Sequence, residues 1–225
     1  MRLKVSVVFG ALVLALLAVP GAPASSKATY YLSLGDSLAQ GFQPIGGPLS
    51  PESPPGYNQG YADQLFKLTR DRYEQLREVK LGCGGETTTT LRFGGICAYE
   101  EGSQLAEAVA FLQENAGQIA FVTIDIGPND LFTGAPGAIV VNLPVILTAL
   151  RAAAGPDVPI IGMNFYDPFL PGAWAQGGLA QPPLNVLREC EWTWACARPP
   201  VGFDIHANTD GYGVIAVAFE GVLAP

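Results

Sequence analysis

One serine and one histidine are the residues of this chain best suited to nucleophilic catalysis. Ser37 lies in Gly35-Asp36-Ser37-Leu38, where a turn from a strand into a helix would present its hydroxyl at the edge of a sheet. A hydroxyl is a weak nucleophile unless a base removes its proton, and His206 is the only histidine in the sequence. Each residue also has an ordinary explanation, as a helix N-cap for the serine and as a structural or exposed side chain for the histidine.

Two further segments could supply hydrogen-bond donors to a developing negative charge. Residues 82–88, Gly-Cys-Gly-Gly-Glu-Thr-Thr, follow a short apolar piece, and glycine lets a backbone N–H approach a ligand closely. No lysine follows, which argues against a phosphate cradle. Gly127-Pro128-Asn129-Asp130 follows a longer apolar run, and the Asn129 amide donates hydrogen bonds without carrying charge. Alone, either segment could be a simple turn.

Strands that alternate with helices are expected to position these segments. The apolar and β-branched patterns predict strands at 29–34, 79–81, 119–126 and 158–165, and helices at 61–73, 104–115, 138–154 and 210–223. Pro144 predicts a kink or a break in the third helix, and the Pro/Gly-rich residues 44–60 predict a long surface loop. The order implies an α/β fold with a parallel sheet, whose ligands lie beyond the carboxyl ends of the strands.

Taken together and in this order, the four segments resemble the SGNH hydrolases, also called the GDSL lipase/esterase family. Residues 35–38 match the nucleophile block, 84–87 look like the oxyanion-glycine block, 127–130 match the asparagine block, and 206–212 look like the histidine block. The resemblance covers nearly the whole chain after the N-terminal segment. It implies a three-layer α/β/α fold with a parallel sheet, the flavodoxin-like fold of SGNH hydrolases.

The resemblance also implies a serine ester hydrolase without a metal or an organic cofactor. Ser37 would be the nucleophile and His206 the general base and acid. The N–H groups of Ser37 and Gly85 and the side chain of Asn129 would form the oxyanion hole, with Gly85 preferred to Gly84 by its offset from the following threonine. The expected substrate is an ester of a small molecule, a lipid or a glycan. A carbohydrate O-acetylesterase and a non-catalytic binding module on the same fold are the alternatives.

The sequence departs from the family pattern in two places. The usual acid lies three residues before the histidine, a position occupied here by Phe203, whereas Asp204 lies two residues before it. Either Asp204 or a backbone carbonyl near Phe203 would orient the imidazole. In addition, residues 166–203 contain no convincing strand, so the last strand is very short or part of the usual fold is missing.

Aromatic residues crowd this same segment, at Tyr166, Phe169, Trp174, Trp192 and Trp194. They could form a wall for an acyl chain, stack on sugars, or pack around a disulfide loop. Asp125, Asp130 and Asp167 lie near strand ends, where structural hydrogen bonding is a commoner role than paired-carboxylate glycosidase chemistry.

The N-terminus predicts export. Arg2 and Lys4 precede an apolar run at 5–19, and Ala22-Pro23-Ala24 is a small-residue cleavage site, so residues 1–24 are expected to be a cleaved signal peptide. A run of 15 residues is shorter than the roughly 20 that a membrane-spanning helix needs, although a retained anchor is the alternative. Residues 25–225 would be the secreted hydrolase domain.

Export favours disulfides for the four cysteines. Four cysteines allow three pairings, and local pairing would join Cys83 to Cys97 and Cys190 to Cys196.

Composition sets the remaining limits. The 225 residues carry a net charge of −8, with 49% hydrophobic and 14% charged residues, so a single domain with a substantial core is expected. The acidic balance argues against a nucleic-acid partner. One histidine excludes a metal centre built from several histidines, and we expect a monomer.

Overall fold

Four parallel strands form the centre of the protein in this computed structural model, which describes residues 29–44, 59–73, 75–177 and 181–223. The strands are β1 (Tyr30–Gly35), β2 (Arg77–Lys80), β3 (Ile119–Asp125) and β4 (Ile160–Gly162), in the spatial order β2-β1-β3-β4. The neighbours pair in parallel throughout. Later strands are therefore added on both sides of β1. The carboxyl ends of β1 and β3 meet at the resulting switch point, which is where ligands bind in open α/β sheets.

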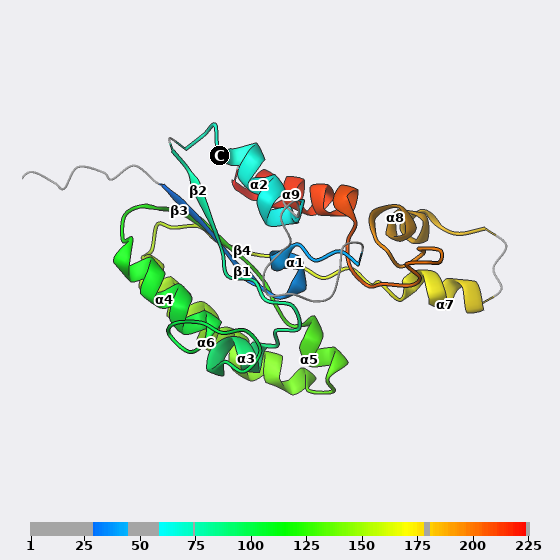
Figure 1. Cartoon of the computed structure of the whole chain (residues 1–225), viewed down its shortest axis with the longest axis horizontal. Coiled ribbons are helices and arrows are strands. Elements are labelled where there is room, and N and C mark those ends of the chain that lie inside the picture. Colours follow the sequence, from blue (N-terminus) through cyan, green and yellow to red (C-terminus); the bar gives the residue numbers. More distant parts are fainter. Residues whose placement is uncertain (1–28, 45–58, 74, 178–180, 224–225) are drawn as a thin grey trace, which may run out of the picture.

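Helices cover both faces of this sheet (Figure 1). On one face lie α2 (Tyr61–Thr69) and α9 (Thr209–Leu223), and on the other lie α3 (Thr88–Phe93), α4 (Gln104–Glu114) and α6 (Pro136–Ala154). Two short helices, α1 (Ser37–Gln40) and α5 (Pro128–Phe132), follow β1 and β3 directly, whereas α7 (Leu170–Gln176) and α8 (Leu184–Trp192) form a projection beside this end of the sheet. The fold is the expected three-layer α/β/α arrangement.

Two apolar clusters, one on each face of the sheet, hold the layers together. Along β1 the side chains alternate, so that Tyr31 packs with α2 and α9 while Leu32 and Leu34 pack with α4 and α6. Every residue of β3 is buried, as the continuous β-branched run predicts for a strand covered on both sides. The buried centre of the sheet therefore gives the ends of β1 and β3 a rigid base.

The structure differs from the sequence predictions at several elements. Helix α2 ends at Thr69 rather than near residue 73, and β4 has three residues rather than eight. Of the kink or break predicted at Pro144, the break is wrong, because α6 runs through this proline as one helix of 19 residues. Pro144 has no N–H for the carbonyl of Val140, and Val140 is exposed, so that carbonyl can bond to water instead.

No fifth strand follows β4 in the described part of residues 166–203. The chain forms α7 and α8 there, and then an isolated antiparallel bridge joins Thr193 to Ala207. Backbone hydrogen bonds from Trp194 N to His206 O and from Asn208 N to Trp192 O extend this pairing. The segment before His206 is thus held by a short antiparallel pair rather than by the sheet.

The predicted signal peptide lies outside the described residues, as does most of the loop predicted at 44–60. Both predicted disulfides are present, Cys83–Cys97 and Cys190–Cys196. Within the described part of the chain, α6 is the one helix whose length and apolar composition would allow it to cross a membrane. It packs along α3 and α4 as a surface helix of the domain.

Glu78 of β2 makes the stability of this fold depend on pH. Its Oε1 atom is buried and has no hydrogen-bond partner among the described residues. Burial, and then the charge of Asp63, raise the pKa of Glu78 to about 7 from an ordinary 4.5. A carboxyl whose pKa is higher in the folded state destabilises the fold as pH rises through this interval, since ionisation is then easier in the unfolded chain.

We therefore expect Glu78→Gln to raise the free energy of unfolding by about 1–3 kcal/mol at pH 8 and by little at pH 4. Urea denaturation at the two pH values measures the difference. An equal gain at both would contradict the assignment, because the amide replaces a carboxyl that is already neutral at pH 4.

Candidate active site

Ser37, His206 and Asp204 form a chain of hydrogen bonds at the carboxyl edge of the sheet. The Ser37 Oγ atom lies 2.9 Å from His206 Nε2, and His206 Nδ1 lies 2.7 Å from Asp204 Oδ1. An ionised carboxylate only accepts hydrogen bonds, so Nδ1 carries the ring proton and Nε2 is left to accept the proton of the serine hydroxyl. This is the geometry of an activated serine nucleophile with an oriented base.

The end of β1 places Ser37 against the end of β3. Gly35 has a φ of 135°, and a side chain there would put its Cβ 2.0 Å from the backbone oxygen of Asp125. Only glycine fits this approach. Asp36 then caps α1 by accepting a hydrogen bond from the N–H of Leu38 at 3.0 Å, and Ser37 becomes the first residue of the helix. Its N–H has no partner within α1 because it is a first-turn donor.

His206 is fixed from several directions. Asp204 Oδ1 accepts a hydrogen bond from the backbone N–H of His206 at 2.9 Å as well as from the ring. The ring of Phe42 packs edge-on against the imidazole, with ring centroids 4.4 Å apart, and the Tyr166 hydroxyl donates to the carbonyl of Ile205 at 2.7 Å. Of the two ways left open to orient the imidazole, the structure has the Asp204 carboxylate on Nδ1.

The hydrogen bonds from His206 also decide the charge of Asp204. Partial burial of Asp204 would raise its pKa, but the hydrogen bonds from the ring and the backbone of His206 outweigh burial and lower this pKa below its ordinary value. Asp204 is therefore ionised at neutral pH, in the state that can stabilise a positive charge on the imidazole.

Asn129, at the start of α5, lies near Oδ2 of Asp36, whereas Oδ1 of Asp36 caps α1. Its Nδ2 atom donates to the carbonyl of Glu86 at 2.8 Å and lies 3.4 Å from Asp36 Oδ2. The short bond fixes the amide, whereas the long one leaves one hydrogen available for a stronger acceptor. Gly85 has a φ of 86°, and its N–H donates to no other described residue. The structure thus brings the two predicted oxyanion loops into contact.

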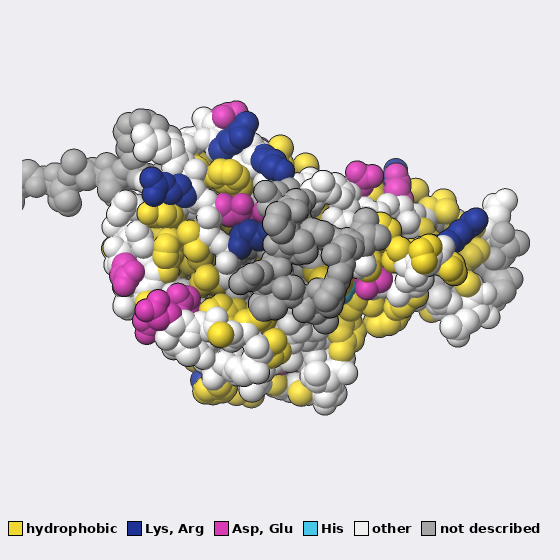
Figure 2. All heavy atoms as spheres, in the orientation of Figure 1, with side chains coloured by type: hydrophobic (Ala, Val, Ile, Leu, Met, Phe, Trp, Pro, Cys, Tyr) yellow, Lys and Arg dark blue, Asp and Glu magenta, His cyan; other side chains and the backbone are white. Residues whose placement is uncertain are grey.

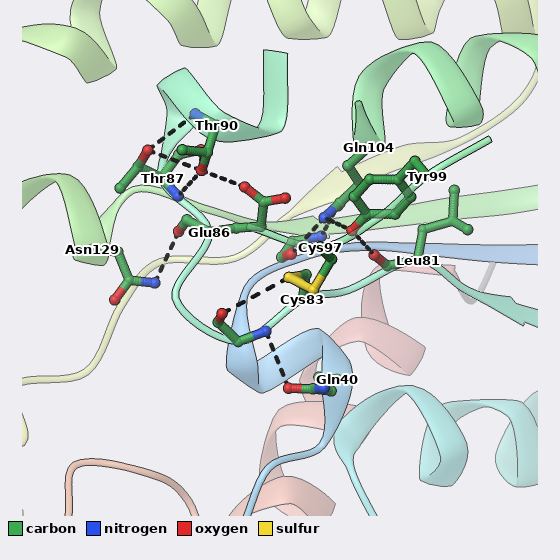
Figure 3. Close-up of a disulfide and its surroundings, with 12 residues drawn as sticks. Gln40, Leu81, Cys83, Glu86, Thr87, Thr90, Cys97, Tyr99, Gln104 and Asn129 are labelled. Carbon is green, nitrogen blue, oxygen red and sulfur yellow. Dashed lines mark hydrogen bonds between the residues drawn. A yellow bond between two sulfur atoms is a disulfide. The ribbon is translucent and has the colours of Figure 1, made fainter. Parts of the chain in front are cut away.

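Figure 3 shows how the loop that contains Gly85 is held. The Cys83–Cys97 disulfide joins two cysteines that are 14 positions apart in the chain, on either side of Gly85. The N–H of Cys83 donates to the carbonyl of Gly35, and the N–H of Gly84 donates to Gln40 Oε1. Covalent and hydrogen-bonded contacts therefore tie this loop to the segment that carries the candidate nucleophile.

Gln104 is a buried residue that the sequence analysis missed. Its side-chain amide accepts a hydrogen bond from the N–H of Gly35 at 2.7 Å and donates to the carbonyl of Gly35 at 3.0 Å. It therefore fixes the residue from which the chain turns toward Ser37. Its only sequence signal was its place after Ser103, the cap of α4, and such a signal does not predict a partner 69 residues away.

Two further carboxyl groups, those of Asp36 and Asp125, lie close to Ser37. Asp36 and Asp125 are both buried, and burial raises the pKa of each. The neighbouring charge of Asp36 raises the pKa of Asp125 further, to well above its ordinary value. The Tyr61 hydroxyl donates to Asp125 Oδ1 at 2.6 Å, whereas Asp125 Oδ2 has no partner among the described residues. We therefore expect Asp125 to be the member of the pair that keeps a proton.

Three phenylalanine side chains border the site. The ring centroids of Phe132 and Phe169 lie 5.8 Å apart, those of Phe169 and Phe203 lie 5.9 Å apart, and each of the three side chains is about half exposed. The aromatic residues predicted to gather in segment 166–203 do not all lie together. Tyr166 and Trp192 line an apolar cavity of about 490 Å³ between β4, α8 and α9. Neither Ser37 nor His206 lines this cavity. Trp174 and Trp194 have buried indole nitrogens without partners in the described structure.

The chain belongs to the GDSL-like lipase/acylhydrolase family, whose pattern matches residues 33–198. The fold agrees. The crystal structure of TesA matches with a TM-score of 0.52 and 20% identity, covering 88% of this chain and 99% of that one. An acetyl xylan esterase from Geobacillus stearothermophilus matches with a TM-score of 0.50 and 19% identity, covering 88% and 95%. No curated protein sequence matches the chain.

The described residues hold no group of three or more His, Cys, Asp or Glu side chains that could bind a metal ion. Asp130, one of the carboxylates near a strand end, is fully buried and has a structural partner. Its two oxygens accept hydrogen bonds from the hydroxyl of Thr88 at 2.6 Å and from the N–H of Thr88 at 2.8 Å. Asp130 thereby joins the helix of Asn129 to the oxyanion loop.

We expect Asp130→Ala to lower the free energy of unfolding by about 2–4 kcal/mol, because it leaves the buried donors of Thr88 unpaired. The exposed Asp157 provides the control, and Asp157→Ala should change the value by less than about 0.5 kcal/mol. Urea denaturation followed by circular dichroism measures both. Equal stability of the two variants would show that Asp130 does not hold the loops together.

Proposed function

We propose that this protein is an exported serine ester hydrolase that works through an acyl-enzyme on Ser37. The observation that carries the proposal is the continuous hydrogen-bonded chain from Ser37 Oγ through His206 to Asp204. Membership of a family of lipases and acylhydrolases supports the reaction class. Two disulfides and the N-terminal segment 1–24 support export, with residues 25–225 as the mature protein.

In the first half of the reaction, Ser37 Oγ attacks the ester carbonyl and its proton moves to His206 Nε2. The carbonyl oxygen becomes an oxyanion, which accepts hydrogen bonds from the N–H groups of Ser37 and Gly85 and from Asn129 Nδ2. Asp204 stabilises the positive imidazole. When the tetrahedral intermediate collapses, the C–O bond breaks and His206 returns the proton to the leaving alcohol.

In the second half, water replaces the alcohol. His206 removes a proton from the water as it attacks the acyl carbonyl, the same donors hold the second oxyanion, and the proton returns to Ser37 Oγ as the acid leaves. The exposed rings of Phe132, Phe169 and Phe203 provide an apolar border for the acyl group. The protein acts as a monomer and needs no cofactor.

Hydrolysis of p-nitrophenyl esters from acetate to palmitate tests this function. We expect activity that extends to medium chains, is lost in Ser37→Ala, and falls about 10²–10³-fold in kcat in Asn129→Ala. Activity confined to acetate would favour a carbohydrate O-acetylesterase. A folded wild type that is as inactive as Ser37→Ala, and that resists fluorophosphonate labelling, would leave a non-catalytic binding module.

Asp204→Asn tests the third member of the hydrogen-bonded chain. The amide would favour the wrong tautomer of His206, so we expect kcat to fall by about 10²–10⁴. Because the pKa of Asp204 lies below its ordinary value, Asp204 stays ionised from about pH 5 to pH 8 and a loss should be seen throughout this range.

Asp210→Asn, at an exposed carboxylate four residues beyond His206, is the matched control and should keep wild-type activity. The pH–rate profiles of the three proteins check both statements. A loss in Asp204→Asn of no more than a few-fold would indicate a Ser–His dyad.

A further inference from the structure

Helix α6 turns an uncommonly apolar side toward solvent. Its inner side buries Asn142, Ile146 and Leu150. Its outer side exposes Val140 at 77% and Val141 at 66%, and further along exposes Val145 and Leu147. Surface helices usually place charged or polar residues on this side. An exposed apolar stripe of this kind marks an interaction site.

This stripe continues to the border of the candidate active site. Helix α5 ends at Phe132, and α6 begins four residues later. Phe132 then contacts Phe169, which stacks on Phe203 next to Asp204. The docking face is defined here as Val140, Val141, Val145 and Leu147 of α6 together with Phe132 and Phe169. Its one end therefore lies beside the residues that would cleave an ester.

The docking face is also uncharged. Residues 131–150 contain no Asp, Glu, Lys or Arg, in a protein whose net charge is −8. On the face that Figure 2 shows, the Lys and Arg side chains gather mainly over β2 and α2, away from α5. Because the docking face itself carries no cation, it offers no electrostatic attraction to anionic lipid headgroups. The partner that fits the docking face best is therefore an uncharged surface.

We propose that the docking face binds a neutral lipid–water interface and so brings the active site to esters held in lipid. The proposal rests on the function proposed above, and it names water-insoluble acyl esters as the substrate class. Peripheral binding of this kind grows with the apolar area that enters the interface. The Phe132–Phe169–Phe203 border then gives an ester a path from the lipid to Ser37 that does not cross water.

The composition favours lipid over a protein partner. Protein interfaces concentrate their energy in Trp, Tyr and Arg, and the docking face contains none of these residues. A second copy of the chain on this face would also cover the border of the site at Phe132 and Phe169. A lipid surface instead supplies the substrate there.

Partitioning onto phosphatidylcholine vesicles tests the proposal, with protein purified after export. We expect Val140→Glu/Val141→Glu to lower the partition coefficient about tenfold or more, because two carboxylates would have to leave water. The control Leu68→Glu/Val217→Glu makes the same charge change at exposed apolar residues of α2 and α9, on the other side of the sheet. It should partition within about twofold of the wild type.

Three further results are expected. Binding to neutral vesicles should persist at 0.5 M NaCl, because salt at this concentration screens charges over a Debye length of about 3–8 Å but does not weaken an apolar contact. Both double variants should hydrolyse monomeric p-nitrophenyl butyrate at the wild-type rate. Ser37→Ala should bind vesicles as tightly as the wild type, so that docking is measured independently of hydrolysis.

The proposal is overturned if the wild type does not partition, or if Val140→Glu/Val141→Glu partitions as the wild type does. It is equally overturned if sedimentation shows a dimer that this variant dissociates without any vesicle binding, since the face would then join two copies. Vesicle binding that the variant abolishes, in a protein inactive on every soluble ester, would support the docking face and refute the proposed hydrolase.

Discussion

The contact between the ends of β1 and β3 is the constraint on which the candidate site depends. Gly35 approaches the backbone of Asp125 so closely that no side chain fits between them, and the next two residues turn the chain into α1. This contact sets Ser37 at a fixed distance from the loop that carries Asn129. Gln104 and the Asp36–Asp125 pair then bond to the same junction. The proposed oxyanion donors and the proposed nucleophile are therefore parts of one rigid unit.

The base reaches this unit by a different route. The described residues contain no strand beyond β4. Instead, residues 192–194 pair with the segment around His206, and the Cys190–Cys196 disulfide closes the same loop. Asp204 can serve from two residues before His206 because one carboxylate oxygen accepts from both the backbone and the ring. A short hydrogen-bonded pair thus replaces the sheet as the support of the imidazole.

The absence of a fifth strand from the described residues also shapes the surface around the site. It leaves β4 at the sheet edge, where the apolar cavity lined by Tyr166 and Trp192 forms. The projection of α7 and α8 brings Phe169 against Phe132 and Phe203 at the opening of the site. The segment between β4 and His206 therefore contributes both the apolar cavity and two of the three exposed phenylalanine rings.

Sequence reasoning alone predicts the fold class, the four main strands, the principal helices and the four segments of the site. These follow from local causes, such as the burial of β3 on both faces and the residue types that a nucleophile, a base and a neutral amide require. Its motif order was sufficient to place Ser37, His206 and Asn129 at one edge of a sheet. The local disulfide pairing was also correct, because short loops are the easiest to close.

The groups that surround these residues depend on how the chain packs in three dimensions. No local pattern predicts that Gln104 bonds to Gly35, or that Thr193 pairs with Ala207, since such contacts depend on how distant elements meet. The continuity of α6 through Pro144 depended on the exposure of Val140, and the orientation of His206 by Asp204 depended on a turn that spacing alone left undecided. Local propensity fixes elements, whereas long-range packing fixes the partners of each polar group.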